Sequence, residues 1–239
     1  MAVLWSNQLR WYVGAFDLST ATTRSSVTLQ SPALDRTVYS LPAEVSQADV
    51  RRDEAEWAGL FEDGSRGLEG LIGTLIGTVG QMMSFVIGTT TGDRAYCGTV
   101  GVMAMKPEAR LGDLVRVVGN FKPDKQMLPS VHYGPSQVTT ADGTSGTHDA
   151  STASTGNFVL FVHVFRLTGT LTVNLQHSAA GTIWTDVATA TATFTATGST
   201  AIEVTSGTLL RRTHLKWVFS SATGSSDIFG ALDRSRTSA

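Results

Sequence analysis

Five histidines are the first candidates for metal binding or proton transfer in this 239-residue chain: His132, His148, His163, His177 and His214. No two of them have the spacing of a metal-binding pair, and the sequence contains neither the zinc-protease motif nor the zinc-deaminase motif. His163 lies in an apolar stretch with the pattern of a strand, so we expect a core or interface residue whose ring nitrogens have hydrogen-bond partners. The histidines predict no metal site.

Carboxylates, glycines and serines give no stronger indication of catalysis. Asp53, Glu54 and Glu56 stand close enough in sequence to pair for acid–base work. The charged face of a half-exposed strand gives the same pattern, and we prefer that interpretation. The glycines between residues 67 and 80 lack the Lys-Ser/Thr pair that follows a phosphate-binding loop, and no Gly-x-Ser-x-Gly motif occurs. We expect no enzymatic activity and no cofactor.

Composition argues against several further classes of protein. Cys97 is the single cysteine, which excludes an intramolecular disulfide and argues against a cysteine-based zinc site; we expect it to pack as a small hydrophobe in a strand. The net charge is −2 and charged residues make up 16% of the chain, so no nucleic-acid-binding patch is expected. Residues 1–8 lack the pattern of a secretion signal, and we expect the protein to be made and used without crossing a membrane.

One helix is predicted, at residues 65–77, in a chain that otherwise has β patterns. Ser65 is a plausible N-cap, and apolar residues recur on one face at Leu68, Leu71, Ile72, Leu75 and Ile76. The glycines of this segment weaken the helix, so it should form only when packed against a sheet. Residues 68–87 are long enough to cross a bilayer, but Gln81, the glycines and the lack of a basic flank favour a short helix followed by a strand.

The fold class predicted from these patterns is mainly β. Residues 1–130 form the expected first domain, with an N-terminal arm at 1–16 that runs into a first strand. A meander of three short strands is predicted at 83–88, 95–105 and 113–121. Residues 45–61 are highly charged and end on apolar residues; a strand or a helix fits, and we prefer the strand.

The second half has a different composition. Residues 131–157 are rich in Thr, Ser and Gly and are expected to form a linker or an exposed loop. Residues 158–239 contain about six short alternating or apolar segments, which predicts an antiparallel β-sandwich.

Residues 26–130 resemble the tail tube (major tail) protein of long-tailed bacteriophages. The resemblance lies in three motifs: Ala33-Leu34-Asp35-Arg36-Thr37, Gly59-Leu60-Phe61-Glu62-Asp63-Gly64, and Tyr96-Cys97-Gly98-Thr99-Val100-Gly101 leading to Val115–Asn120. Leu171–His177 and the turn Ser178–Asp186 are similar to the β-sandwich that some of these proteins carry at the C-terminus. The sequence departs from the family pattern where Arg51, Arg52, Asp53 and Glu54 stand together.

This resemblance implies an assembly. In the family, the first domain is a β-sandwich or half-barrel flanked by a helix. Its copies form rings, usually hexameric, whose inner sheets join into one barrel, and the rings stack into a tube through which DNA passes. The implied partners are other copies of the chain, other tail proteins at the tube ends, and DNA as a transient, non-specific cargo. No membrane anchor is implied. The implied location is the tail of the virion, after assembly in the host cytoplasm.

The resemblance also assigns roles to particular residues. The loop at 37–46 would reach the neighbouring ring, and residues 5–12 would be an arm at a subunit boundary. The contact candidates between rings are Thr37, Val38, Tyr39, Leu41, Pro42 and Glu44. The candidates for charges in the lumen or between subunits are Asp49, Asp53, Glu54 and Glu56.

A protein of another class remains open at this point: a virion decoration protein or a carbohydrate-binding protein that works through its C-terminal sandwich. Glycan-binding surfaces usually present exposed aromatic rings, and Trp184 and Trp217 are the tryptophans of that half. Trp184 stands beside a turn, whereas Trp217 lies inside an apolar strand.

Overall fold

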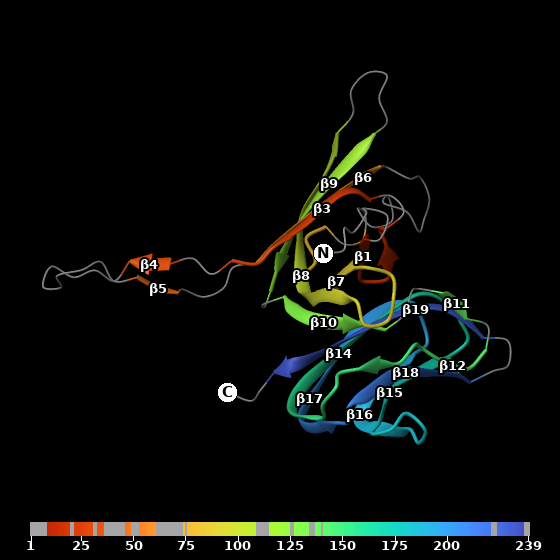
Figure 1. Ribbon diagram of the computed structural model, residues 1–239. Helices are drawn as coiled ribbons and strands as arrows, with labels where there is room; N and C mark the ends of the chain where they lie inside the picture. Colours follow the sequence, from red (N-terminus) through yellow and green to blue (C-terminus); the bar gives the residue numbers. More distant parts are fainter. Residues whose placement is uncertain are drawn as a thin grey trace, which may run out of the picture. The chain divides into compact units, whose positions relative to one another are not determined.

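The computed structural model is built from antiparallel strands (Figure 1). It describes residues 9–19, 22–30, 33–35, 46–48, 53–60, 74, 76–108, 115–124, 127–133, 137–139, 141–220 and 224–236. The mainly β fold class predicted from the sequence is confirmed. The chain divides into two compact units: unit 1 is Met1–Thr20, Met82–Cys97 and Leu128–Ala239, and unit 2 is Ala21–Gln81 and Gly98–Met127.

Unit 1 contains a large sheet with the strand order β17-β14-β19-β10-β8-β7-β1-β2. These strands are β1 (Leu9–Val13), β2 (Phe16–Asp17), β7 (Gln81–Ile87), β8 (Arg94–Glu108), β10 (Leu128–His132), β14 (Ser154–Thr168), β17 (Gly198–Leu209) and β19 (Ser225–Arg236). A short strand, β11 (Gln137–Thr139), also pairs with β19. β8 contributes its first residues, up to Cys97, to this unit.

The second sheet of unit 1 has the order β12-β18-β15-β16, and β13 pairs with β18. Its strands are β12 (Gly143–Thr144), β13 (His148–Asp149), β15 (Leu171–Ser178), β16 (Thr185–Phe194) and β18 (Arg212–Phe219). Leu171, Val173 and Leu175 of β15 share one apolar core with Leu160 and Val162 of β14, so the two sheets form a sandwich.

β14 is buried on both of its faces. Its even-numbered residues from Phe158 to Val164 contribute to the core of the sandwich, and Val159 and Phe161 belong to a second apolar cluster with Tyr12 and Phe229. This explains why β14 reads in sequence as a continuous apolar run without alternation.

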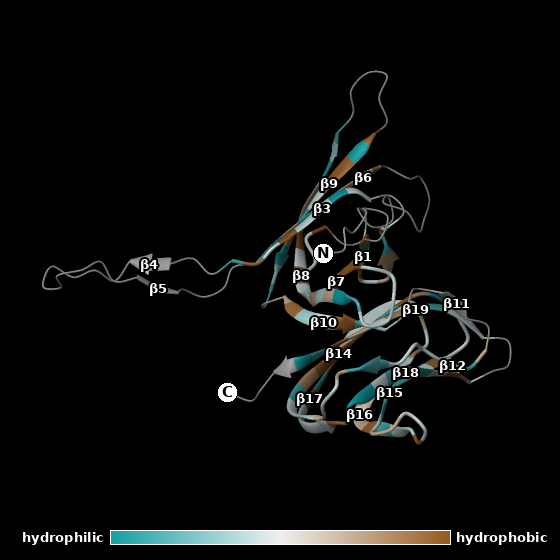
Figure 2. Ribbon diagram, viewed as in Figure 1, coloured by the Kyte–Doolittle hydropathy of each residue, from teal (hydrophilic) through white to brown (hydrophobic). Residues whose placement is uncertain are grey.

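Unit 2 contains a four-stranded sheet with the order β3-β6-β9-β8, in which β8 takes part with its residues from Gly98 onward. The remaining strands are β3 (Thr22–Thr28), β6 (Glu54–Leu60) and β9 (Arg116–Pro123). Alternation along β9, visible as changes of hydropathy in Figure 2, turns Val117 and Phe121 to the buried side. The strand interpretation of residues 45–61 is confirmed at β5 (Ser46–Ala48) and at β6.

The stretch 131–157, expected to be a linker or loop, contains three short strands, β11, β12 and β13. Side chains fasten the latter part to β18: the Ser145 hydroxyl accepts a hydrogen bond from the Leu215 N–H (2.9 Å), and Asp142 accepts one from the Phe219 N–H (2.7 Å). A Thr-, Ser- and Gly-rich composition is therefore compatible both with a loop and with short strands that are held by hydrogen bonds to a neighbouring strand.

Several predictions of domain organisation take a different form or lie outside the described residues. Trp11, Tyr12 and Val13, part of the expected arm, are fully buried in β1, which pairs with β7. Of the helix predicted at 65–77, the structure describes Thr74, Ile76 and Gly77, so that helix stays a prediction. The units are interleaved in sequence, and the boundaries at 130 and 158 also stay predictions about folding domains. No helix among the described residues has the length and apolarity needed to span a bilayer.

Candidate functional site

The solvent-facing side of the unit 2 sheet carries two of the four candidate charges. Glu54 and Glu56 are exposed and alternate with the buried Ala55 and Trp57. The charged side chains that are exposed on β3, β6, β9 and the unit 2 part of β8 are Arg24, Glu54, Glu56, Lys106, Glu108, Arg116 and Lys122. Four are cationic and three are anionic, so this surface, which we call the charged face, is close to neutral.

The register brings these charges into cross-strand rows. Glu56 lies between Ser26 on β3 and Asn120 on β9, and Arg116 lies opposite Glu108. The one close ion pair described on this face joins Lys106 Nζ to Glu108 Oε1 at 2.9 Å, between side chains that are 75% and 51% exposed. Exposed pairs of this kind contribute only about 0–1 kcal/mol, so the charges stay available to a partner.

The buried side of the same sheet fixes these positions. The Trp57 indole N–H donates a hydrogen bond to the Thr22 hydroxyl at 2.7 Å, and Trp57 is fully buried. Gly119 lies opposite Trp57 on β9. A Cβ at Gly119 would come within 3.1 Å of the Met105 methyl carbon and of the Phe121 ring, so a larger residue there would have to displace these groups by a few tenths of an ångström.

Asp53 does not share the charged face with Glu54 and Glu56. Its side chain is only 6% exposed, and its carboxylate accepts a hydrogen bond from the Met127 N–H at 2.7 Å. Its position indicates a structural role, the joining of two segments of unit 2. Asp49, the fourth candidate for a lumen charge, lies outside the described residues.

Two strands of unit 2 form a sheet of their own. β4 (Ala33–Asp35) pairs with β5 in the antiparallel register Ala33 to Ala48 and Asp35 to Ser46, and no other described strand pairs with either (Figure 1). They follow β3 and precede β6, which are themselves paired. The six contact candidates from Thr37 to Glu44 lie between β4 and β5, outside the described residues, so their contacts stay predictions.

Exposed apolar side chains also gather in unit 2. The large exposed hydrophobic residues in the described part of the chain are Leu29, Ile76, Val79, Met103, Val115 and Ile183, and only the last belongs to unit 1. Val79 and Met103 both lie within 4 Å of the place where Gly101 would carry a Cβ.

The histidines and the cysteine have structural positions. His163 is fully buried; the Gly14 carbonyl accepts a hydrogen bond from its Nδ1 (2.8 Å), and the Ser84 hydroxyl donates to its Nε2 (2.9 Å). Burial lowers the pKa of His163 to about 4. Burial raises the pKa of the Cys97 thiol to about 12. The predictions of a core histidine and a buried cysteine are confirmed, and the described residues contain no cluster that could hold a metal ion.

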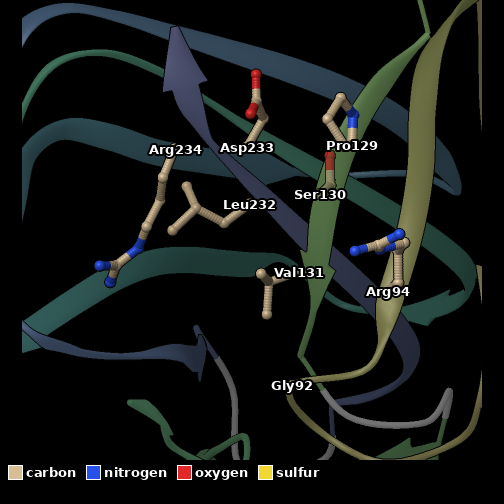
Figure 3. A pocket seen from close by; sticks show the side chains of 8 residues that line it. All are labelled: Gly92, Arg94, Pro129, Ser130, Val131, Leu232, Asp233 and Arg234. Atoms are coloured by element: carbon tan, nitrogen blue, oxygen red, sulfur yellow. The ribbon is translucent and has the colours of Figure 1, made fainter. Parts of the chain in front are cut away.

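A pocket of about 430 Å³ lies among the described residues of unit 1. Its lining residues are Gly92, Arg94, Pro129, Ser130, Val131, Leu232, Asp233 and Arg234. Figure 3 shows Asp233 and Arg234 leaving β19 in opposite directions, as neighbours on a strand must. Its polar side chains, Arg94, Ser130, Asp233 and Arg234, come from the three strands β8, β10 and β19.

Sequence reasoning identified Glu54 and Glu56 but missed the cations that accompany them. The signal was present in β9, where Arg116, Asn120 and Lys122 alternate with Val117 and Phe121. A period of two places the polar set on one face of a strand. The position of Asp53 had no such signal, because its partner Met127 is distant in sequence.

The chain has distant similarity to proteins of known structure. No protein-family model matches the chain, and no curated protein matches it. Among solved structures, the chain is similar to the Dit (gp 19.1) protein of phage SPP1, described as a hub adsorption protein of phages that infect Gram-positive bacteria. The identity is 15% and the TM-score 0.39, over 94% of this chain and 98% of that one. It is also similar to a chain of the native gene transfer agent virion, with 11% identity and a TM-score of 0.37, over 45% of this chain and 82% of that one. Both TM-scores are below 0.5, so neither structure decides the function of this chain.

Proposed function

We propose that this chain is a structural virion protein that joins copies of itself into stacked rings, hexameric as in the family it resembles, and so forms the tube of a phage tail. The tube would conduct DNA during ejection, and other tail proteins would bind at its ends. The protein would be located in the virion tail after assembly in the host cytoplasm. It would act without catalysis and without a cofactor.

The observation that carries this proposal is the β4–β5 hairpin. A two-stranded hairpin is at best marginally stable in water, because each strand has only one neighbour. β4 and β5 pair with each other and with no other described strand. A neighbouring copy that covers the hairpin would supply the missing contacts, and the segment between the two strands is the one that the sequence resemblance assigns to contact between rings.

The four-stranded sheet of unit 2 supports the same proposal. Its outer strand β3 pairs only with β6 among the described strands, which leaves one edge for a further strand. A contact between different edges of identical copies generates a closed ring when the rotation between copies allows closure. The exposed apolar residues of unit 2 give such a contact an area to bury.

The charged face suits a passage for DNA. Each cation that neutralises a phosphate raises the magnitude of the salt dependence of binding by about 0.9, so a strongly basic wall would hold the duplex. Four cations and three carboxylates interspersed on one face give little net attraction. We therefore place Glu54 and Glu56 in the lumen or between subunits, and leave the buried Asp53 out of this set.

Deleting the hairpin tip tests the proposal. Replacing residues 37–44 with an Asn-Gly turn closes the hairpin early, keeps Asp35 opposite Ser46, and leaves β3 and β6 intact. We expect a folded protein with an unchanged far-ultraviolet circular dichroism spectrum that forms no tubes in negative-stain electron microscopy. The exposed turn variant Ala196→Ser serves as a control and should form tubes as the unmodified chain does. Tubes of normal length from the deletion variant would contradict the proposal.

A further inference from the structure

The outer face of the second sheet of unit 1 carries a row of polar side chains joined across three strands. His214 of β18 and Asp186 of β16 both lie opposite Gln176 of β15. The Gln176 side-chain oxygen is 2.7 Å from His214 Nε2, and the Gln176 amide nitrogen donates to the Asp186 carboxylate at 2.6 Å. These bonds hold three polar side chains in fixed positions before any ligand arrives.

Trp184 covers one end of this row. Its ring stacks on the His214 imidazole with a centroid distance of 3.8 Å and an interplanar angle of 26°. His214 is consequently 5% exposed although it belongs to the outer face, whereas Trp184 remains partly exposed. One face of the indole is occupied by the imidazole, so the exposed part belongs to the other face and the ring edges. The preceding residue, Ile183, is 79% exposed.

Asn174 and Lys216 form the next cross-strand pair along the same face. Both are partly exposed, and neither side chain has a hydrogen bond or ion pair within the described part of the chain. Thr191 lies opposite Asn174 on β16 and is exposed. An amide, an ammonium group and a hydroxyl thus lie one cross-strand pair along this face from His214, on which Trp184 stacks.

We propose that this outer face binds a pyranose sugar. The C–H groups on one side of a pyranose ring are apolar and suit the face of an indole, while its hydroxyls are both donors and acceptors. Asn174 supplies both functions, Lys216 donates, and the Asp186 carboxylate accepts. The site does not favour a phosphate-bearing ligand. Arg212, on the same face of β18, is bonded to Asp149 and to the Ala180 carbonyl, which leaves Lys216 as the cation of this set, and Asp186 would repel a second negative charge.

This inference does not depend on the proposed function, because the site belongs to a single copy of the chain. A shallow face with one aromatic ring should bind weakly, in the millimolar range by order of magnitude. Copies repeated in an assembly would increase the apparent affinity through multivalency, by roughly 10²- to 10⁴-fold where the ligand is also repeated.

Saturation-transfer difference NMR on the full chain tests the site with three soluble probes: lactose, maltose and N,N′-diacetylchitobiose. We expect transfer from the protein to the ring protons of at least one probe, and a loss of about tenfold or more in affinity for Trp184→Ala. The matched control is Trp217→Phe. Trp217 lies on the same sheet but packs against the sandwich core, so this variant should keep the signal.

Since removing Trp184 uncovers His214, a second variant tests the same site with the indole in place. Asn174→Ala combined with Lys216→Ala should lower the affinity several-fold while the thermal midpoint stays near that of the unmodified protein. The proposal is overturned if the unmodified chain shows no transfer to any of the three probes. It is equally overturned if transfer persists unchanged in both site variants.

Discussion

β14 and β6 are both central strands, but β14 is buried on both faces and β6 on only one. β14 of unit 1 is buried on both faces, with Leu160 in one apolar cluster and Phe161 in the other. β6 of unit 2 alternates, with Trp57 buried and Glu56 exposed. The difference teaches where a function can reside. A strand enclosed on both sides can only support the fold, whereas a strand with one wet face can present side chains to a partner.

Alanine substitutions at adjacent positions of β14 and β6 test most directly whether the two strands differ in burial. In β14, Leu160→Ala and Phe161→Ala should both destabilise the protein, by about 2–5 and 3–5 kcal/mol, because each leaves a cavity. In β6, Trp57→Ala should cost about 3–5 kcal/mol and Glu56→Ala less than about 0.5 kcal/mol. Urea unfolding measures all four. Equal losses at Trp57 and Glu56 would remove the distinction between the strands.

The buried imidazole of β14 adds a dependence on pH. The pKa of His163 is lowered to about 4 in the folded protein, against an ordinary value near 6.5, so protons bind the unfolded chain more readily. The stabilisation is fully present above pH 6.5 and is lost as the pH falls toward 4, by about 3 kcal/mol in total. His163→Gln should lose most of this slope between pH 7 and 4.5 in urea unfolding. An unchanged slope would show that other groups cause it.

The exposed side of β6 should affect binding to DNA and leave the fold intact. Replacing Glu54 and Glu56 together with lysine turns the charged face strongly cationic. We expect tighter retention of double-stranded DNA and a salt slope larger by about 1–2, since each phosphate contact adds about 0.9. Glu203→Lys, an exposed change on β17 of unit 1, is the control for added charge. Identical salt slopes for the two variants would show that the charged face does not contact DNA.

Local patterns predicted much of this molecule. The charged stretch with Glu54 and Glu56 favoured a half-exposed strand over a helix, and the apolar or alternating segments after Phe158 indicated the strands of a sandwich. Local sequence patterns could not show that β1 pairs with β7 or that the Asp53 carboxylate accepts a hydrogen bond from the Met127 N–H. Both interactions join residues that are far apart in the chain. The Thr- and Ser-rich stretch after residue 140 gave no sign of its two short strands for the same reason, since both pair with β18.

The candidate sites were likewise predicted only in part from the sequence. Glu54 and Glu56 were candidates because they stand close together in sequence and because the resemblance gives them a role, and Trp184 was noted because it stands beside a turn. The link from Trp184 through His214 and Gln176 to Asp186 requires three strands in register, which no single segment of sequence encodes.

The enclosed thiol of Cys97 has a practical consequence. A group that is fully buried and protonated at neutral pH does not react with maleimides or disulfide reagents. A cysteine introduced in place of Tyr39 would therefore be the single reactive thiol of each copy, with no need to remove the natural one. Fluorophores or spin labels attached there would test whether the segments that link β4 to β5 in different copies approach one another, as the proposed assembly requires.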